Sequence, residues 1–161
     1  MYTRRKTIPV QVGSVTIGGD APIVVQSMAS TDTRNVAATV SQIKELEELN
    51  RETFRLAVPD MEAAEALKSI KQQVTVPLIA DIHFDYRLAL ASIEAGIDGL
   101  RLNPGNIGEP DRVKAVVKAA AERSIPIRIG VNAGSMPKKA DPSLTVAERM
   151  VEAAMEHVKI L

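Results

Sequence analysis

Apolar residues along the chain follow two different periods, and each period predicts a different kind of element. In residues 10–12 and 15–17, apolar and polar side chains alternate, and Gly13-Ser14 lies between the two segments. A period of two is typical of a strand with one buried face, and glycine tolerates the positive φ of a tight turn. Residues 8–18 are therefore expected to form a small antiparallel hairpin that covers one end of the core.

From about residue 23 onward, short apolar runs alternate with segments of helical spacing. The runs begin near residues 23, 53, 77, 99 and 125, a spacing that fits one strand plus one crossover helix. Within each run, apolar and polar residues do not alternate, which is typical of parallel strands buried on both faces. An open doubly wound sheet and a (β/α)₈ barrel both contain such units. A barrel needs eight units, so five units in 161 residues would leave it incomplete.

Local signals give the expected bounds of the individual elements. The strands are expected at 23–25, 53–58, 77–82, 99–103 and 125–131. Helices are expected around 36–46, 60–73 and 85–95, from Pro110 onward, and after a capping box formed by Thr145 and Glu148. The last helix is expected to face the core with the residues that share its apolar spacing, Val151, Ala154, Val158 and Leu161.

Composition narrows the classes of function. Twenty basic and twenty acidic residues give zero net charge, which argues against a nucleic-acid partner. No apolar run is long enough to span a membrane, and the N-terminal residues lack the apolar stretch of a signal peptide. Cysteine is absent, so neither a disulfide framework nor a Cys-ligated metal is expected, as in a cytoplasmic protein.

Three arginines lie inside predicted strands. These are Arg55, Arg101 and Arg128. Parallel βα folds bind their ligands at the C-terminal ends of such strands. A buried guanidinium needs an anionic partner, and Asp81 is the obvious internal one. One carboxylate is too little for three arginines at equivalent positions, whereas a guanidinium fork matches a phosphate bidentately. The pattern predicts a phosphate or diphosphate ligand; the alternative is pairing within the core or at its rim.

Two nearby motifs each allow two interpretations. Residues 103–108, Asn-Pro-Gly-Asn-Ile-Gly, either turn backbone N–H groups toward an anion or form an ordinary turn. Asp81, His83 and Asp85 would share one face of an extended strand and so could bind a metal. The favoured interpretation is that Asp81 pairs with an arginine, His83 makes a hydrogen bond at the rim and Asp85 caps the next helix. His157, on the last helix, is expected at the surface.

Several long segments, in order, resemble one enzyme family. Together they are similar to the bacterial 4-hydroxy-3-methylbut-2-en-1-yl diphosphate synthase family. The segments are VVQSMASTDT, FRLAVPDMEAAEAL, PLIADIHFDYRLAL, GLRLNPGNIG, IPIRIGVNAGS and MVEAAMEHVKIL. The resemblance implies a TIM barrel and an oxidoreductase of isoprenoid biosynthesis. That enzyme converts 2-C-methyl-D-erythritol 2,4-cyclodiphosphate to 4-hydroxy-3-methylbut-2-enyl diphosphate. The resemblance also implies a homodimer, flavodoxin or ferredoxin as electron donor, and a 4Fe-4S cluster held by a C-terminal domain.

The same resemblance implies roles for particular residues. Arg55, Arg101 and Arg128 would contact the diphosphate and the substrate. Asp81, Asn103 and Asn132 would be polar groups at the barrel mouth that also bind the substrate. Because the chain has no cysteine, no cluster is expected on it. Residues 1–161 are expected to be a single partial barrel domain that is inactive alone. The alternatives are a self-associating phosphate-binding barrel fragment and another diphosphate-handling barrel enzyme similar to pterin synthases.

Overall fold

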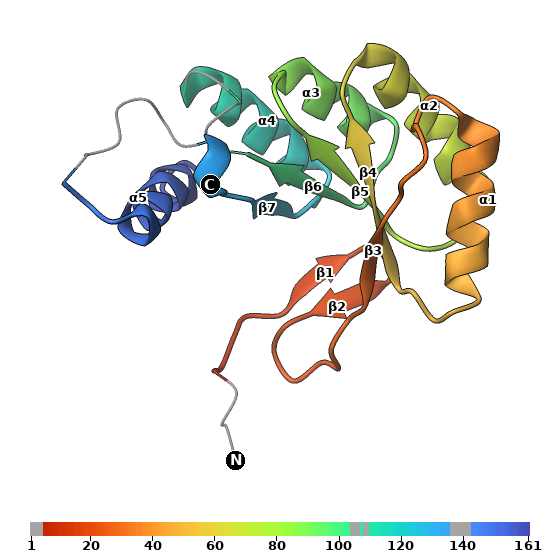
Figure 1. The fold of residues 1–161 in the computed structure, drawn as a ribbon, viewed down its shortest axis with the longest axis horizontal. Helices are drawn as coiled ribbons and strands as arrows, with labels where there is room; N and C mark the ends of the chain where they lie inside the picture. The colour runs from red at the N-terminus through yellow and green to blue at the C-terminus, as the bar shows by residue number, and fades with distance from the viewer. Residues whose placement is uncertain (1–4, 104–106, 108–109, 136–142) are drawn as a thin grey trace.

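In a computed structural model, a five-stranded parallel sheet carries helices along one face and a two-stranded hairpin at one end (Figure 1). The structure describes residues 5–103, 107, 110–135 and 143–161. The hairpin consists of β1 (Val10–Val12) and β2 (Val15–Ile17). The sheet contains β3 (Gln26–Met28), β4 (Thr53–Val58), β5 (Leu78–Ile82), β6 (Gly99–Leu102) and β7 (Ile127–Ile129). The helices are α1 (Val36–Glu47), α2 (Met61–Lys71), α3 (Tyr86–Glu94), α4 (Pro110–Glu122), α5 (Val146–Val158) and a short 3₁₀ helix, η1 (Ala133–Ser135).

The order of the strands decides between the two architectures that the sequence leaves open. The strands lie in chain order, β3-β4-β5-β6-β7, and all four pairs are parallel. A doubly wound sheet reverses its strand order at a switch point, whereas a barrel adds each strand beside the previous one. Helices α1 to α4 follow one another along one face of the sheet (Figure 1). The expected incomplete barrel-type α/β fold is confirmed, since the five described strands form an open sheet.

Alternate residues of the strands separate the two faces of the sheet. On β4, the side chains of Phe54, Leu56 and Val58 are completely buried in the layer that the helices cover. Leu67 of α2 and Val116 of α4 belong to the same cluster and are also completely buried. The opposite face, which we call the inner face, therefore receives the residues between these positions, and several of them are charged.

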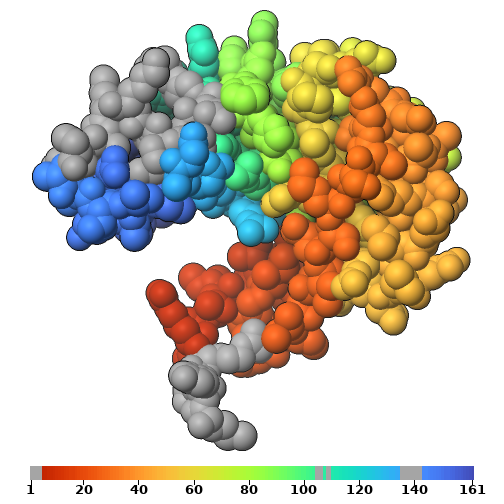
Figure 2. Space-filling model, viewed as in Figure 1, coloured from red at the N-terminus to blue at the C-terminus, as the bar shows by residue number. Residues whose placement is uncertain are grey.

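The hairpin covers the N-terminal end of the inner face, as the sequence predicts. Its turn uses Gly13, whose φ is +55°. Val12 is only 5% exposed, and a Cβ atom placed on Gly99 would lie 3.4 Å from Cγ1 of Val12 and 3.3 Å from Cγ1 of Ile79. Val12 thus packs beside the first residues of β5 and β6. In Figure 2 the hairpin lies below the body of sheet and helices.

The first strand of the sheet is three residues later than expected. Residues 23–25 are not a strand, and Ile23 is 77% exposed instead of buried on both faces. Residues Gln26–Met28 pair with β4 instead. The backbone N–H of Val25 donates to Oε2 of Glu52 at 2.9 Å. The prediction was wrong because β3 is an edge strand of the described sheet, where no second neighbour covers an apolar run.

Two further predictions fail at the other edge of the sheet. Strand β7 contains three residues instead of the expected seven. The apolar side of α5 is largely exposed: Val151 is 61% exposed and Leu161 52%, and Ala153 is buried instead. Helix α5 packs on β7, the edge strand, so the described residues cover only part of it. The Thr145–Glu148 capping box at its start is confirmed.

Candidate functional site

Among the described residues, four charged side chains lie on the inner face of the sheet. The register aligns Asp81 of β5 with Arg101 of β6, and Arg101 with Arg128 of β7. On β4, Ala57 is aligned with Asp81, so Arg55 lies two residues earlier, on the same face but one layer deeper. The expectation of three equivalent arginines is therefore correct for Arg101 and Arg128 and wrong for Arg55.

Asp81 lies between two of these arginines. Asp81 is 2% exposed, and its Oδ1 accepts a hydrogen bond of 3.0 Å from Nη1 of Arg101. Its Oδ2 lies 3.2 Å from Nε of Arg55, close enough for an ion pair although the N–H does not point at it. A buried carboxylate is stable only when it is paired, so the predicted pairing of Asp81 with an arginine is confirmed.

The third arginine, Arg128, is in a different position. It is exposed, and no ion pair joins it to another residue in the described part of the chain. The three arginines and one carboxylate together leave an excess of two positive charges on the inner face. Guanidinium groups match phosphate oxygens geometrically, so this face can accept a ligand with several negative charges.

Two contacts of the arginines were missed by reasoning from the sequence. Nη2 of Arg55 donates to the thioether of Met28 at 3.0 Å. Nη2 of Arg101 donates to the carbonyl of Gly130 at 3.0 Å. The sequence signal for each is weak: a methionine in a polar segment, and a glycine after a short apolar run. Both contacts depend on which strands are neighbours.

The two predicted asparagines follow adjacent strands. Asn103 comes directly after β6 and is 4% exposed, whereas Asn132 follows β7 and is exposed. Because β6 and β7 are parallel neighbours, both residues lie at the C-terminal edge of the sheet, as do the ends of the arginine-bearing strands. The glycine-rich turn after Asn103 lies outside the described residues, except for Ile107.

The Asp81, His83 and Asp85 triplet does not form one row. Strand β5 ends at Ile82, and Asp85 caps α3 by accepting a hydrogen bond from the backbone N–H of Arg87 at 2.9 Å. The Arg87 side chain, and then this N–H, hold the pKa of the Asp85 carboxyl below its usual value. Nε2 of His83 lies 3.6 Å from Oδ1 of Asp81, which is too long for a hydrogen bond. The cap is confirmed, and the described residues contain no group of three His, Cys, Asp or Glu that could hold a metal.

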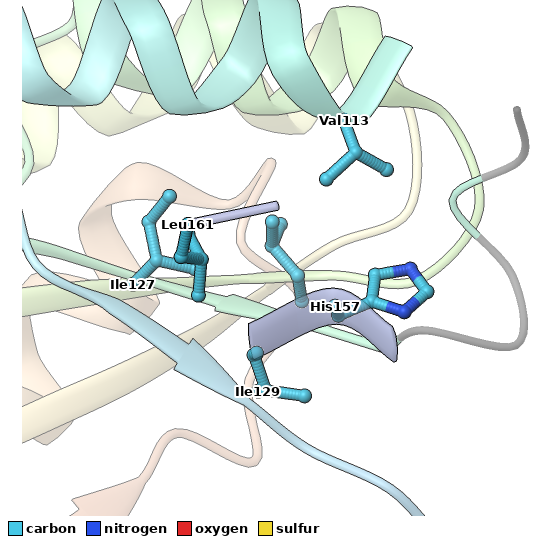
Figure 3. A pocket seen from close by; sticks show the side chains of 6 residues that line it. Val113, Ile127, Ile129, His157 and Leu161 are labelled. Carbon is cyan, nitrogen blue, oxygen red and sulfur yellow. The ribbon is translucent and has the colours of Figure 1, made fainter. Parts of the chain in front are cut away.

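A small cavity lies between α5 and the helix-covered face of the sheet (Figure 3). Its volume of about 10 Å³ has room for no more than one water molecule, so it is not a substrate site. Both ring nitrogens of His157 are buried without a hydrogen-bond partner among the described residues, so its expected surface position was wrong. The cavity is lined by Leu102, Val113, Ile127, Ile129, His157 and Leu161.

Comparison with solved structures supports the fold. The 7,8-dihydropteroate synthase from Vibrio fischeri ES114 superposes with a TM-score of 0.57. The match covers 94% of this chain and 62% of that chain. The sequence identity is 12%, so the likeness shows the fold alone. In the described part of the chain, every helix is too short or too polar to cross a membrane.

Comparison with known sequences finds close relatives, including three proteins named 4-hydroxy-3-methylbut-2-en-1-yl diphosphate synthase (flavodoxin). The protein from Dehalococcoides mccartyi (strain BAV1) is 68% identical over all 161 residues, which cover 46% of its length. The protein from Pseudomonas paraeruginosa is 60% identical over 97% of this chain and 43% of its own length. The protein from Halalkalibacterium halodurans is 56% identical over 98% of this chain and 44% of its own length. The chain thus spans about half the length of the relatives it matches.

A family model extends over nearly the whole chain. The model described as the GcpE TIM-barrel domain matches residues 7–161, which include the hairpin, all five strands of the sheet and all five α-helices. The match to a barrel domain agrees with the order of the strands. The chain therefore belongs to the GcpE TIM-barrel domain family.

Proposed function

We propose that this chain is the substrate-binding part of a 4-hydroxy-3-methylbut-2-en-1-yl diphosphate synthase. That enzyme converts 2-C-methyl-D-erythritol 2,4-cyclodiphosphate to 4-hydroxy-3-methylbut-2-enyl diphosphate by reductive ring opening. The family membership and the names of the relatives support the assignment. The observation that carries it is the excess of positive charge on the inner face, which suits a diphosphate. Residues 1–161 would then form part of a single barrel domain.

The residues of the inner face would divide the binding of the diphosphate between them. Arg128, which is exposed, would present its guanidinium fork to phosphate oxygens. Arg101 and Arg55 would add charge from positions that Asp81 holds in place. Asn103 and Asn132 would offer amide groups at the same edge of the sheet. Asp81 itself would repel the ligand, so its part is to orient the arginines.

The proposed reaction is a reduction, and the family resemblance implies that a 4Fe-4S cluster supplies its electrons, with flavodoxin or ferredoxin as donor. The residues of this chain do not fit such a cluster. The chain contains no cysteine, and its described part holds no group of three metal-ligating side chains. The share of this chain in the reaction is therefore to bind and orient the substrate. The cluster, the electron donor and the homodimer belong to the proposed full-length protein.

The test is the replacement Arg128→Met in the full-length protein. Arg128 has no ion-pair partner among the described residues, so its loss should leave the melting temperature unchanged. A charge-assisted hydrogen bond contributes about 1.5–3 kcal/mol. Binding of the cyclodiphosphate, measured by calorimetry, should therefore weaken by about tenfold to a hundredfold.

The control removes the same charge from the outer surface. Lys118 lies on α4 and is exposed, so Lys118→Met should leave the affinity for the cyclodiphosphate unchanged. If Arg128→Met and Lys118→Met bind the cyclodiphosphate as tightly as the unchanged protein, the proposed role of the inner face is wrong.

A further inference from the structure

Gly130 is in close contact with the guanidinium of Arg101. It follows β7, and its backbone N–H donates to the carbonyl of Leu102 at 2.8 Å, so it continues the pairing with β6. A Cβ atom placed on Gly130 would lie 2.7 Å from Nη2 and 2.8 Å from Cζ of Arg101, and closer still to Nε. Real Cβ atoms essentially never approach another atom within 3.0 Å. Any side chain at residue 130 would therefore displace this guanidinium.

The need for glycine at this position is spatial. The glycines with positive φ are Gly13, Gly18, Gly19 and Gly96 in the described part of the chain, so the backbone of Gly130 is in a region that other residues also adopt. The three nearest atoms to such a Cβ all belong to the far end of one flexible side chain, that of Arg101. An alanine would therefore move Arg101 and leave the backbone of β7 in place.

Two acceptors hold the Arg101 guanidinium on either side. Nη1 donates to Oδ1 of Asp81 and Nη2 donates to the carbonyl of Gly130, each at 3.0 Å. The Arg101 side chain is 14% exposed, so it has little room to find another position. The two bonds fix the plane of the guanidinium across β5, β6 and β7. Glycine at residue 130 allows this arrangement, because the guanidinium lies where a Cβ would be.

We propose that Gly130 is a positioning residue for anion binding: it seats the Arg101 guanidinium at the depth from which that group contacts a diphosphate. This inference rests on the proposed function of the inner face. Gly130 touches no ligand in this role and acts through Arg101 alone. A side chain at residue 130 would push the guanidinium out of line with Asp81, and the diphosphate would lose a charge-assisted contact.

The test is a double-mutant cycle in the full-length protein, with inorganic diphosphate as the probe and calorimetry as the assay. Gly130→Ala alone should weaken diphosphate binding by about tenfold, the loss expected for one misplaced charged hydrogen bond. In an Arg101→Ala background, the added methyl group meets no guanidinium. Gly130→Ala should then cause no further loss, and this coupling is a result that general damage to the fold would not give.

A control changes the surface away from the inner face. Lys118 lies on α4 and is exposed. Lys118→Met should therefore bind diphosphate like the unchanged protein. An equal loss from Gly130→Ala with and without Arg101, or no loss from it at all, would overturn the role of Gly130. Failure of the unchanged protein to bind diphosphate would instead overturn the proposed function and the choice of diphosphate as the anion.

Discussion

Replacement of Asp81 by asparagine tests whether this carboxylate holds the inner face together. Asp81→Asn keeps the size of the side chain and removes its charge. Arg55 and Arg101, whose side chains are 25% and 14% exposed, would then face each other without an anion between them. A buried cation that loses its partner is strongly destabilising. The folded state should therefore lose stability, although the hydrophobic core is unchanged.

The magnitude follows from the two distances to Asp81. At an effective dielectric constant of about 20, unit charges separated by the observed 3.0 and 3.2 Å attract by about 5 kcal/mol per pair. Most of this is offset by the loss of hydration, and breaking a buried pair costs about 3–5 kcal/mol in measured cases. The amide oxygen of asparagine can still accept a hydrogen bond from Arg101. We therefore expect the lower end of this range, about 3 kcal/mol.

Thermal unfolding of the full-length protein measures this loss. For a barrel domain of about 250 residues, 1 kcal/mol corresponds to about 2–4 °C, so Asp81→Asn should lower the melting temperature by about 6–12 °C. The matched control is Asp111→Asn, because the Asp111 side chain is 92% exposed and pairs with Lys114 at 3.2 Å. Such surface pairs contribute about 0–1 kcal/mol. Similar shifts for the two variants would refute the view that Asp81 neutralises the buried arginines.

Two further predictions concern regions away from the inner face. Hydrogen bonds from the Arg34 side chain, and then from its backbone N–H, lower the pKa of Asp32 from 3.8 to about 2. The contribution of Asp32 to stability is therefore complete above about pH 4 and is lost as the pH falls toward 2; in Arg34→Met, an NMR titration should find the pKa of Asp32 closer to 3.8. Thr145→Ala removes the capping box of α5 and should lower the free energy of unfolding by about 1 kcal/mol, whereas an unchanged denaturation midpoint would show that the cap is dispensable.

The elements that the sequence predicts well are those with local causes. Helix α3 begins after Asp85, which caps it, and ends before Gly96, whose φ of +86° stops the helix. The period of the apolar residues is enough to place β4, β5 and β6 between such signals. The order of the strands could not be predicted from the sequence pattern, because a βα repeat is compatible with more than one sheet topology.

The predictions that failed depend on neighbours that lie far away in the sequence. Ile23 and Val151 are both apolar residues in apolar segments, yet each lies at an edge of the described sheet and is exposed. The depth of Arg55 relative to Arg101 follows from the register between strands, which composition does not reveal. The contact of Gly130 with Arg101 likewise joins two strands. Charge and residue type therefore predicted a charged face of the sheet, but not the layers in which the side chains lie.

The hairpin at the N-terminal end of the sheet affects the electrostatic field that these four charges would exert on a ligand. Val12 fills the space beside Ile79 and Gly99, so apolar side chains lie next to Arg55, which is aligned with Ile79, and below the layer of Asp81 and Arg101. Charges with apolar material on one side polarise the solvent less there, and their field is strongest toward the open side. The hairpin, which carries none of the four charges, would thus direct the attraction of the arginines toward the C-terminal edge of the sheet.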